Sequence, residues 1–189
     1  MLVWLDTETT GLHPNDIILE VGIIITDDDL TPQAERNWLI VPPRAALHAL
    51  ARRTHGVTTR WANLDPHVID MHERSGLTAE LASGHGYRLP EAERNIRQWL
   101  DQHDQPGRQP MCGANIPFDR NVLQRWMPHV ADWFHYRNID VSTLRELARR
   151  WAPDLETPKT GTHRAIPDCR DAITQLDHLA THNFIWKPR

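Results

Sequence analysis

Runs of hydrophobic residues near the start of the chain predict three strands. Leu2–Leu5 is a short apolar run that ends in acidic residues, and Ile17–Thr26 is rich in the β-branched residues that favour a central strand. Arg36–Val41 is predicted as a third strand, stopped by a pair of prolines. Polar turns at His13–Asp16 and Asp27–Asp29 separate these runs, so this part of the chain is expected to form a meander.

Apolar residues at helical spacing dominate the rest of the chain. The predicted helices cover Pro90–His103, about Pro117 to Met127, a stretch that begins after Ser142, and about Ala165 to His182, with short strands at Met111–Ala114 and Asn138–Val141. Ser142 is expected to cap the third of these helices. Between Arg44 and Arg88 the pattern is poor, and we expect short helices and loops there.

Strands that come first, followed by interleaved helices and strands, predict an α/β fold in which helices pack on a mixed sheet. The 189 residues are enough for one domain with a core, and the sequence shows no repeat and no linker. We therefore expect a single domain over residues 1–189. Hydrophobic residues make up 40% of the chain and charged residues 24%, which are ordinary values for a globular protein.

Charge, cysteines and hydropathy narrow the class of protein. The formal charge of −4 and the lack of an evident basic stretch argue against a grip on long nucleic acid, so a nucleic-acid substrate would be short or held in a confined site. Cys112 and Cys169 lack C-x-x-C spacing, which disfavours a structural zinc site and fits a reducing cytosol. Asp6 and Glu8 stand where a signal peptide needs apolar residues, and Val21–Ile25 is too short to span a bilayer. We expect a soluble, cytoplasmic protein with no membrane partner.

The first chemical motif is Asp6-Thr7-Glu8. In a strand, residues i and i+2 project to the same side, so the two carboxylates would lie together and repel unless a cation neutralises them. Hard oxygen ligands suit Mg²⁺ or Mn²⁺. The turn that includes Gly11 would let backbone approach a ligand closely. D-x-E is also a common tripeptide on exposed strand edges, and alone it does not establish a metal site.

Two further motifs follow later in the chain. His163-x4-Asp168 would place a histidine just before the last helix and an aspartate on it, and a neutral imidazole is suited to take a proton from water. Among 12 histidines, however, a solvated histidine beside a helix start is an equally simple reading. Asp119 falls in the first turn of a helix, where an aspartate often only stabilises the helix dipole.

Taken together, the three motifs resemble the catalytic residues of the DEDDh 3′→5′ exonucleases in order and spacing. Longer stretches are similar to bacterial oligoribonucleases, which cut dinucleotides and other very short RNAs: HYRNIDVSTLRELARRWAP at His135–Pro153, MHERSGL at Met71–Leu77, LVWLD near the start, and H-x-A-x-x-D at His163. The resemblance implies an RNase H-like fold with a mixed five-stranded sheet flanked by helices. It also implies that Asp6, Glu8, Asp119 and Asp168 bind two Mg²⁺ or Mn²⁺ ions and that His163 is the general base.

The resemblance also implies substrate contacts and a homodimer. Leu12 matches an apolar wedge between two bases, and His72 matches a histidine near the substrate. The remaining matches cap the 5′ phosphate, with the first two reaching across the dimer: Tyr136, Arg137, Ser142 and Thr143. A closed cap would explain a preference for very short RNA. Three of these matches also have a simpler reading: Leu12 as a residue packed under the strand edge, Ser142 as a helix cap only, and Arg137 as a surface cation.

Three departures from the oligoribonuclease pattern fall at substrate positions. Thr9 follows D-x-E where methionine is usual, and Asn115 replaces a serine that helps to hold the 5′ phosphate, although asparagine can still donate a hydrogen bond. The aromatic residue that stacks on a base matches His67, with Trp61 as a second candidate. The segment Arg52–Trp61 is more similar to proofreading-type exonucleases.

The expected function is hydrolysis of dinucleotides and other very short RNAs to 5′-nucleoside monophosphates by a two-metal mechanism. The alternative in the same class is a broader DEDDh exonuclease of the proofreading or RNase T type, acting on single-stranded DNA or longer RNA. A binding module that kept the fold but lost catalysis is a third reading. It is disfavoured because all five catalytic residues are present.

Overall fold

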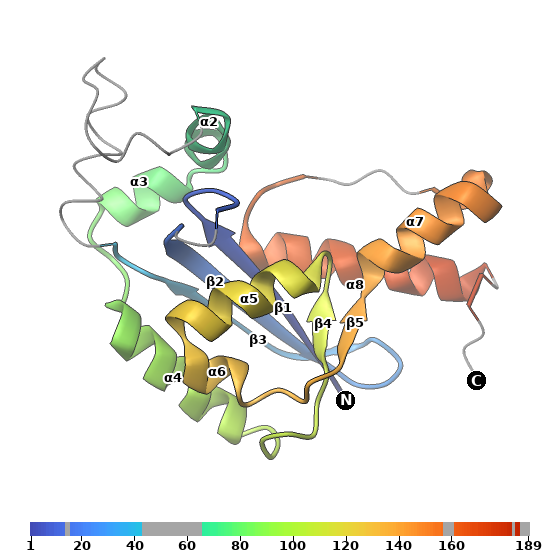
Figure 1. The fold of residues 1–189 in the computed structure, drawn as a ribbon, viewed down its shortest axis with the longest axis horizontal. Coiled ribbons are helices and arrows are strands. Elements are labelled where there is room, and N and C mark those ends of the chain that lie inside the picture. The colour runs from blue at the N-terminus through green and yellow to red at the C-terminus, as the bar shows by residue number, and fades with distance from the viewer. Residues whose placement is uncertain (14–15, 43–65, 157–160, 183, 186–189) are drawn as a thin grey trace.

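A mixed sheet of five strands forms the centre of the computed structural model, which describes residues 1–13, 16–42, 66–156, 161–182 and 184–185. The strand order is β3-β2-β1-β4-β5 (Figure 1). The strands are β1 (Leu2–Thr9), β2 (Ile18–Thr26), β3 (Pro32–Leu39), β4 (Met111–Gly113) and β5 (Asn138–Asp140). The first three pair antiparallel, whereas β4 and β5 run parallel to β1.

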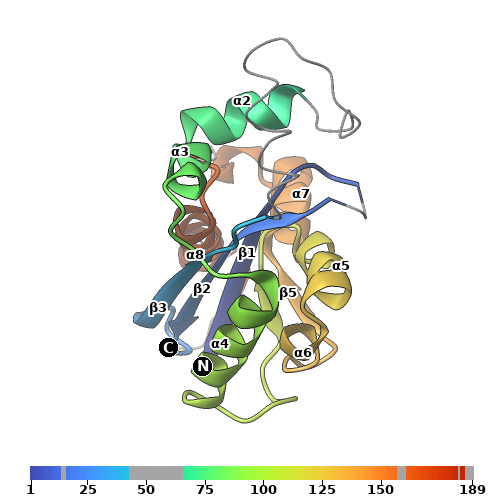
Figure 2. The same cartoon turned by 90° about the vertical axis from the view of Figure 1, so that its left-hand side faces the viewer.

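Helices cover both faces of this sheet. They are α2 (Pro66–Arg74), α3 (Leu77–Ala82), α4 (Leu89–Asp101), α5 (Ile116–Trp126), α6 (Pro128–Ala131), α7 (Val141–Trp151), the short 3₁₀ helix η1 (Pro153–Leu155) and α8 (Ala165–Thr181). Figure 2 shows α8 on one side of the strands and α4, α5 and α6 on the other. Within the described ranges, no helix combines the length and the apolar character that a membrane span requires.

Alternation along β1 builds a separate core on each face. Val3 and Leu5 belong to the larger core with residues of α4, α5 and α6, whereas Trp4 points the other way and packs with Cys169 and other residues of α8. Every residue of β2 is buried, which explains why its apolar run is continuous rather than alternating. The same alternation puts Asp6 and Glu8 on the α8 face of the sheet.

The α/β class and the mixed five-stranded sheet predicted from the sequence are confirmed, but the bounds of the first and third strands were wrong. The first strand continues to Thr9, because β2 pairs with it along its whole length. The third strand begins at Pro32 and not at Arg36, and it ends at Leu39 and not at Val41. It is an edge strand whose outer half is exposed and polar, so hydrophobicity does not mark where it starts.

The expected cap of α7 was also wrong. Asp140, the last residue of β5, occupies the cap position, and its carboxylate accepts a hydrogen bond from the Ser142 backbone N–H. Ser142 therefore lies inside the helix. An aspartate caps as well as a serine does, and Asp140 stands directly before the first helical residue, which decides between them.

Candidate active site

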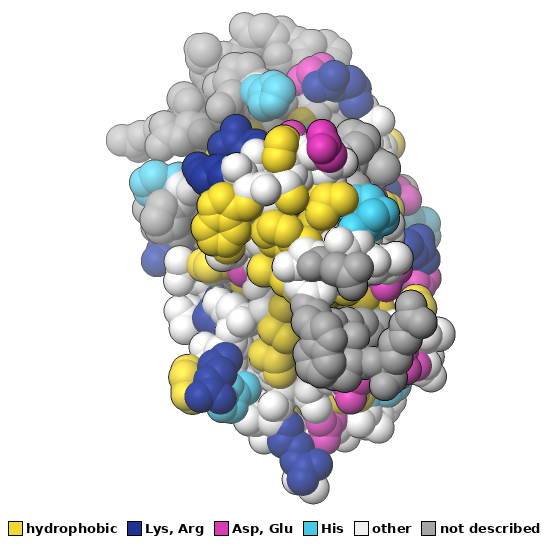
Figure 3. Space-filling model, turned by 90° about the vertical axis from the view of Figure 1, so that its right-hand side faces the viewer, with side chains coloured by type: hydrophobic (Ala, Val, Ile, Leu, Met, Phe, Trp, Pro, Cys, Tyr) yellow, Lys and Arg dark blue, Asp and Glu magenta, His cyan; other side chains and the backbone are white. Residues whose placement is uncertain are grey.

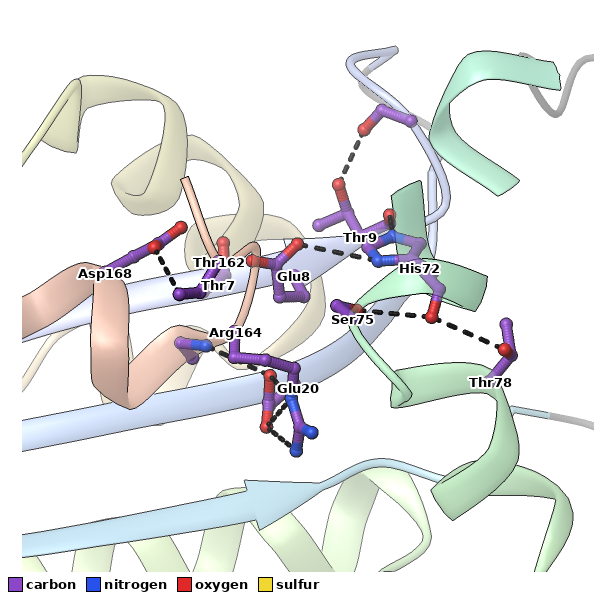
Figure 4. Close-up of polar contacts among 12 residues, drawn as sticks. Thr7, Glu8, Thr9, Glu20, His72, Ser75, Thr78, Thr162, Arg164 and Asp168 are labelled. Carbon is purple, nitrogen blue, oxygen red and sulfur yellow. Dashed lines mark hydrogen bonds and ion pairs between the residues drawn. The ribbon is translucent and has the colours of Figure 1, made fainter. Parts of the chain in front are cut away.

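Three carboxylates meet where β1 passes the start of α8. Asp6 and Glu8 project from the same face of β1. Asp168 projects from the first turn of α8, and Figure 4 shows it together with Glu8. One oxygen from each of the three carboxylates lies within 4.8 Å of the others. The structure thus brings together residues that are about 160 positions apart in the sequence, as the motif spacing predicts.

A glycine allows α8 to approach the sheet this closely. Gly22 of β2 pairs with Asp6 of β1 in the register of the two strands. A Cβ atom on Gly22 would lie 2.7 Å from Ala165 Cβ and 2.8 Å from the Ile166 backbone nitrogen, closer than packed atoms tolerate. The missing side chain therefore lets the first turn of α8 sit directly on β2, which places Asp168 beside Asp6.

Burial and neighbouring negative charges disfavour the ionised form of the Glu8 side chain. Burial, followed by the charges of Asp168, Glu20 and Asp119, raises the pKa of Glu8 to about 8. Ionising all three clustered carboxyl groups costs electrostatic free energy unless a cation neutralises them. A group of oxygen donors without sulfur or imidazole fits a hard divalent cation such as Mg²⁺ or Mn²⁺.

The fourth predicted carboxylate, Asp119, approaches from α5 and lies outside the group of three. Its Oδ1 accepts hydrogen bonds from the Thr7 backbone N–H (2.9 Å) and the Thr7 hydroxyl (2.6 Å). Burial raises the pKa of Asp119 to about 7, although the two hydrogen bonds from Thr7 act to lower it. Asp119 is therefore fixed to the residue between Asp6 and Glu8, and its role as a metal ligand remains a prediction.

His163 lies two residues before α8, with its side chain exposed. It lines a cleft of about 560 Å³, whose opposite wall is formed by Met71, Arg74 and Ser75 of α2 and the turn that follows it. The preceding residue, Thr162, donates a hydrogen bond from its hydroxyl to Asp168 Oδ1 at 3.1 Å (Figure 4). The segment that carries the predicted base is thus tied to a predicted metal ligand.

An ion-pair network that was not predicted from the sequence follows His163. Arg164 donates hydrogen bonds to the buried Glu20 of β2 and to Glu80 of α3. Glu20 also accepts from the Ala165 backbone N–H at 3.0 Å and from the Asn37 side chain at 2.7 Å. Glu20 occupies an apolar run in the sequence, and a buried glutamate in such a run is the signal that could have pointed to a partner cation.

His72 lies beneath the end of β1. Its Nε2 donates a hydrogen bond to the Thr9 carbonyl oxygen at 2.7 Å, and its Nδ1 lies 3.8 Å from Glu8 Oε2 (Figure 4). Burial is the main reason why the pKa of His72 lies below its usual value, so the ring is neutral at pH 7. The ring fastens α2 to the strand end that carries Glu8, and its contact with substrate remains a prediction.

Leu12 lies three residues after the end of β1 and follows two threonines whose hydroxyls form hydrogen bonds. Its side chain is 80% exposed, so it does not pack under the strand edge. The Thr9 hydroxyl donates to the Gly11 carbonyl oxygen at 2.6 Å, and the Thr10 hydroxyl donates to Asp16 Oδ1 at 3.0 Å. An exposed leucine three residues after β1 is available for contact with a base.

Three predicted substrate residues gather around one carboxylate that the sequence reasoning missed. Asp140 Oδ1 accepts from the backbone N–H groups of Asn115 (2.8 Å) and Ser142 (3.1 Å), and its Oδ2 accepts from the Thr143 hydroxyl (3.1 Å). Asn115 itself has a left-handed backbone with φ of 59°. Asp140 thus joins the starts of α5 and α7. The D-V-S-T order, typical of a helix cap, is the signal that could have identified it.

The remaining predicted contacts lie further from the carboxylates. Tyr136 is 74% exposed, with the Arg137 guanidinium 5.3 Å from its ring centre, and both residues precede β5. Because β5 runs parallel to β1, they lie at the opposite end of the strand from Asp140. His67 is exposed at the start of α2. Trp61 lies outside the described residues.

Comparison with known proteins places this geometry in a family. The exonuclease family model (RNase T) matches residues 3–176. The oligoribonuclease of Aromatoleum aromaticum is 41% identical over 97% of this chain and 94% of its own length, and that of Colwellia psychrerythraea is 39% identical over 93% and 91%.

Solved structures show the same fold at lower identity. Exonuclease I from Methylocaldum szegediense matches 95% of this chain with a TM-score of 0.65 at 21% identity, and Escherichia coli exonuclease I in complex with a dT13 oligonucleotide matches 95% with a TM-score of 0.66 at 17% identity. This chain covers 40% and 41% of those longer chains, so the likeness concerns the RNase H-like fold. The matched family model and the relatives that align over nearly their whole length show that the chain belongs to the exonuclease family and, within it, to the oligoribonucleases.

Proposed function

We propose that this protein is a 3′→5′ exoribonuclease that hydrolyses very short RNAs, down to dinucleotides, to 5′-nucleoside monophosphates. The observation that carries the proposal is the group formed by Asp6, Glu8 and Asp168, assembled in a chain whose relatives are oligoribonucleases. The relatives match over nearly the whole chain, which supports a shared substrate class as well as a shared fold.

The reaction breaks the bond between phosphorus and the 3′ oxygen of the penultimate nucleotide. Divalent cations held by Asp6, Glu8 and Asp168, with Asp119 as a further ligand, would supply the Lewis acidity that activates water and stabilises the departing oxygen. His163, which lies five residues before Asp168 and lines the cleft, would take the proton of the attacking water, since an exposed imidazole is suited to that task. The terminal nucleotide leaves with its 5′ phosphate, and the departing 3′ oxygen gains a proton.

Chain-length preference would come from the residues around Asp140. Ser142 and Asn115 lie at the start of α7 and α5, where the positive end of a helix dipole favours a phosphate. Their backbone N–H groups and the Thr143 hydroxyl bond to Asp140, so the Ser142 hydroxyl and the Asn115 side-chain amide would donate to the phosphate. Arg137 of the same chain lies at the other end of β5, so we propose that a second copy supplies it in a homodimer. If residues of both chains surround the terminal 5′ phosphate, an RNA with further nucleotides on that side cannot be accommodated.

An exposed surface supports the homodimer. Trp151, at the end of α7, is 71% exposed. Figure 3 shows hydrophobic side chains gathered on the face where α7 and α8 end, with Lys, Arg and His side chains beside them. Large exposed aromatic residues within an apolar gathering are characteristic of protein interfaces.

The ion and the compartment are further parts of the proposal. All-oxygen ligands favour Mg²⁺ or Mn²⁺, and we propose two ions per site. Cys112 and Cys169 are buried free thiols, which fits the reducing cytoplasm as the place of action.

Turnover of a dinucleotide and of a ten-nucleotide RNA at saturating Mn²⁺ tests the substrate class. We expect much faster cleavage of the dinucleotide. Asp6→Ala should nearly abolish hydrolysis because it removes a metal ligand, and His163→Ala should slow it on the order of 10²- to 10⁴-fold, the usual contribution of a general base. Equal rates on both RNAs would disprove the phosphate cap, and wild-type rates in both variants would disprove the catalytic assignment.

A further inference from the structure

The backbone of the segment that carries His163 is strained. His163 has a φ of 51°, in the left-handed region, and Gly161 has a φ of 58°. A residue with a Cβ atom adopts this conformation at an energetic cost, and it persists only where the surroundings hold it in place. Contacts of the neighbouring residues therefore have to hold the His163 backbone in this conformation.

Arg164 provides that fixation on one side. Its Nε donates to both carboxylate oxygens of Glu20, at 3.1 and 3.2 Å, and its Nη2 donates to Oε1 at 2.8 Å (Figure 4). The other oxygen, Oε2, also accepts from the Ala165 N–H. One carboxylate of β2, only 1% exposed, thus holds the side chain and the backbone that follow His163. A planar guanidinium fork restricts orientation far more than a single ammonium does.

The same guanidinium reaches a second element. Arg164 Nη2 donates to Glu80 Oε2 at 2.7 Å, and Glu80 belongs to α3, which packs against α2. One wall of the cleft is Met71, Arg74 and Ser75, whereas the other is the segment 161–164. The contact between Arg164 and Glu80 therefore connects the wall 161–164 to α3, the helix that packs against the element carrying the other wall.

We propose that Arg164 is a positioning residue: by joining Glu20 to Glu80 it fixes the backbone of His163 and the separation of the two cleft walls. The proposal rests on the role of His163 as general base under the proposed function. Arg164 acts through His163, and its side chain is occupied by the two carboxylates. It also neutralises Glu20, which pairs with Glu8 in the register of β1 and β2.

Kinetics of two variants test this, with a control variant that breaks a different ion pair. Glu80→Gln removes the bridge to α3, and Arg164→Lys keeps the charge but loses the fork. The matched control is Glu35→Gln: Glu35 is about as exposed as Glu80 (44% against 50%) and forms a two-pronged pair with Arg170 of α8, away from the cleft. With a dinucleotide at saturating Mn²⁺, kcat should fall on the order of 10- to 100-fold in the first two variants, the scale of a small displacement of a catalytic group. KM should change little, and the control should keep the wild-type kcat.

Two measurements on the protein without substrate separate positioning from folding. The ring resonances of His163, assigned by their loss in His163→Ala, should shift in Glu80→Gln and Arg164→Lys and stay in place in Glu35→Gln. Mn²⁺ affinity from calorimetry should be unchanged in Glu80→Gln, because the carboxylates of Asp6, Glu8 and Asp168 remain.

The proposal is overturned if His163 resonances and kcat respond to Glu80→Gln no more than to Glu35→Gln, or if the loss of kcat follows a loss of folded protein. A wild-type protein that cleaves no RNA would contradict the proposed function instead, and the resonances would still report on the position of His163.

Discussion

At the residue scale, the most consequential side chain is Glu8, which is buried beside Asp168 and opposite Glu20. A folded protein keeps such an arrangement only if the lost stability is recovered by binding. Burial and like charges that raise a carboxyl pKa are typical of functional sites. A bound cation would relieve the repulsion between these carboxylates, and the free energy so gained would strengthen its binding.

Metal-free protein should therefore lose stability as pH rises. The pKa of Glu8 is about 8 in the folded chain and 4.5 as an ordinary glutamate, so stability is fully present below pH 4.5 and declines as pH rises through 8. We expect Tm in a chelator to fall by several degrees across this window because of this group, and less in Glu8→Gln. Mn²⁺ should restore Tm most at the upper end and release protons in calorimetry. A Glu8→Gln variant with the same pH dependence of Tm as the wild type would contradict this.

The Thr7 hydroxyl makes a second prediction at this scale. Its hydrogen bond to Asp119 favours the ionised carboxylate, so Thr7→Val should raise the pKa of Asp119 further above 7. The acid limb of the pH profile of kcat/KM should move to higher pH by about one unit, the worth of one hydrogen bond to a charged group. Thr7→Ser keeps the hydroxyl and should keep the profile. If Thr7→Ser and Thr7→Val behave alike, the hydroxyl does not control Asp119.

Much of the site could be predicted residue by residue, and the misses have a common cause. Asp6, Glu8 and Asp168 meet because strand alternation and helix position are local properties that spacing records. The ion pair of Arg164 with Glu20 and the hydrogen bond of Asn115 to Asp140 were missed because the partners are distant in sequence, although the cap that Asp140 provides for Ser142 is local. Pairing between separated segments leaves no periodic trace along the chain.

At the scale of elements, the packing of helix α8 on strand β2 determines the geometry of the site. The start of α8 at Ala165 was predicted from its apolar spacing, whereas its close approach to Gly22 could not be, since the sequence does not state which helix covers which strand. β3 shows the same limit. Its polar, exposed start is held by pairing with β2 and not by its own hydrophobicity.

Gly22→Ala should push α8 off the sheet. The new methyl group would meet Ala165 Cβ at 2.7 Å and backbone atoms at 2.8 Å, so the first turn and Asp168 must shift. We expect a destabilisation of about 1–3 kcal/mol from overpacking, and weaker Mn²⁺ binding, measured by denaturation and calorimetry. Adding Ala165→Gly should rescue only part of both effects, because the backbone contacts remain. Full Mn²⁺ affinity in Gly22→Ala would show that the close packing of α8 on β2 does not determine the geometry of the carboxylates.

At the scale of the whole molecule, the exposed Tyr136, Arg137 and Trp151 belong to surfaces that one chain leaves uncovered. A net charge of −4 and the motifs predict a short substrate, but they hold no information on how two chains would face each other. The proposed dimer thus depends on geometry, because Arg137 lies at the far end of β5 from Asp140.

Mixed dimers test this directly. His163→Ala and Arg137→Ala chains should each be nearly inactive alone, whereas co-expressed chains should recover activity. In a mixed dimer, one site combines an intact His163 with the partner's intact Arg137, and the other site lacks both. Sedimentation should give twice the 21.9 kDa of one chain. Mixed chains as inactive as the separate variants, or a mass of one chain at every concentration, would contradict a shared site.

The seat of Asp168 on α8 also has a consequence for biosynthesis. β1, the first strand of the described residues, supplies Asp6 and Glu8, but the third carboxylate arrives only with α8, the last helix of the described residues. A nascent polypeptide stalled before residue 165 would carry an incomplete site and bind Mn²⁺ poorly, which calorimetry on truncated chains would measure. Synthesis order alone would therefore keep the site catalytically silent until the last helix has been made.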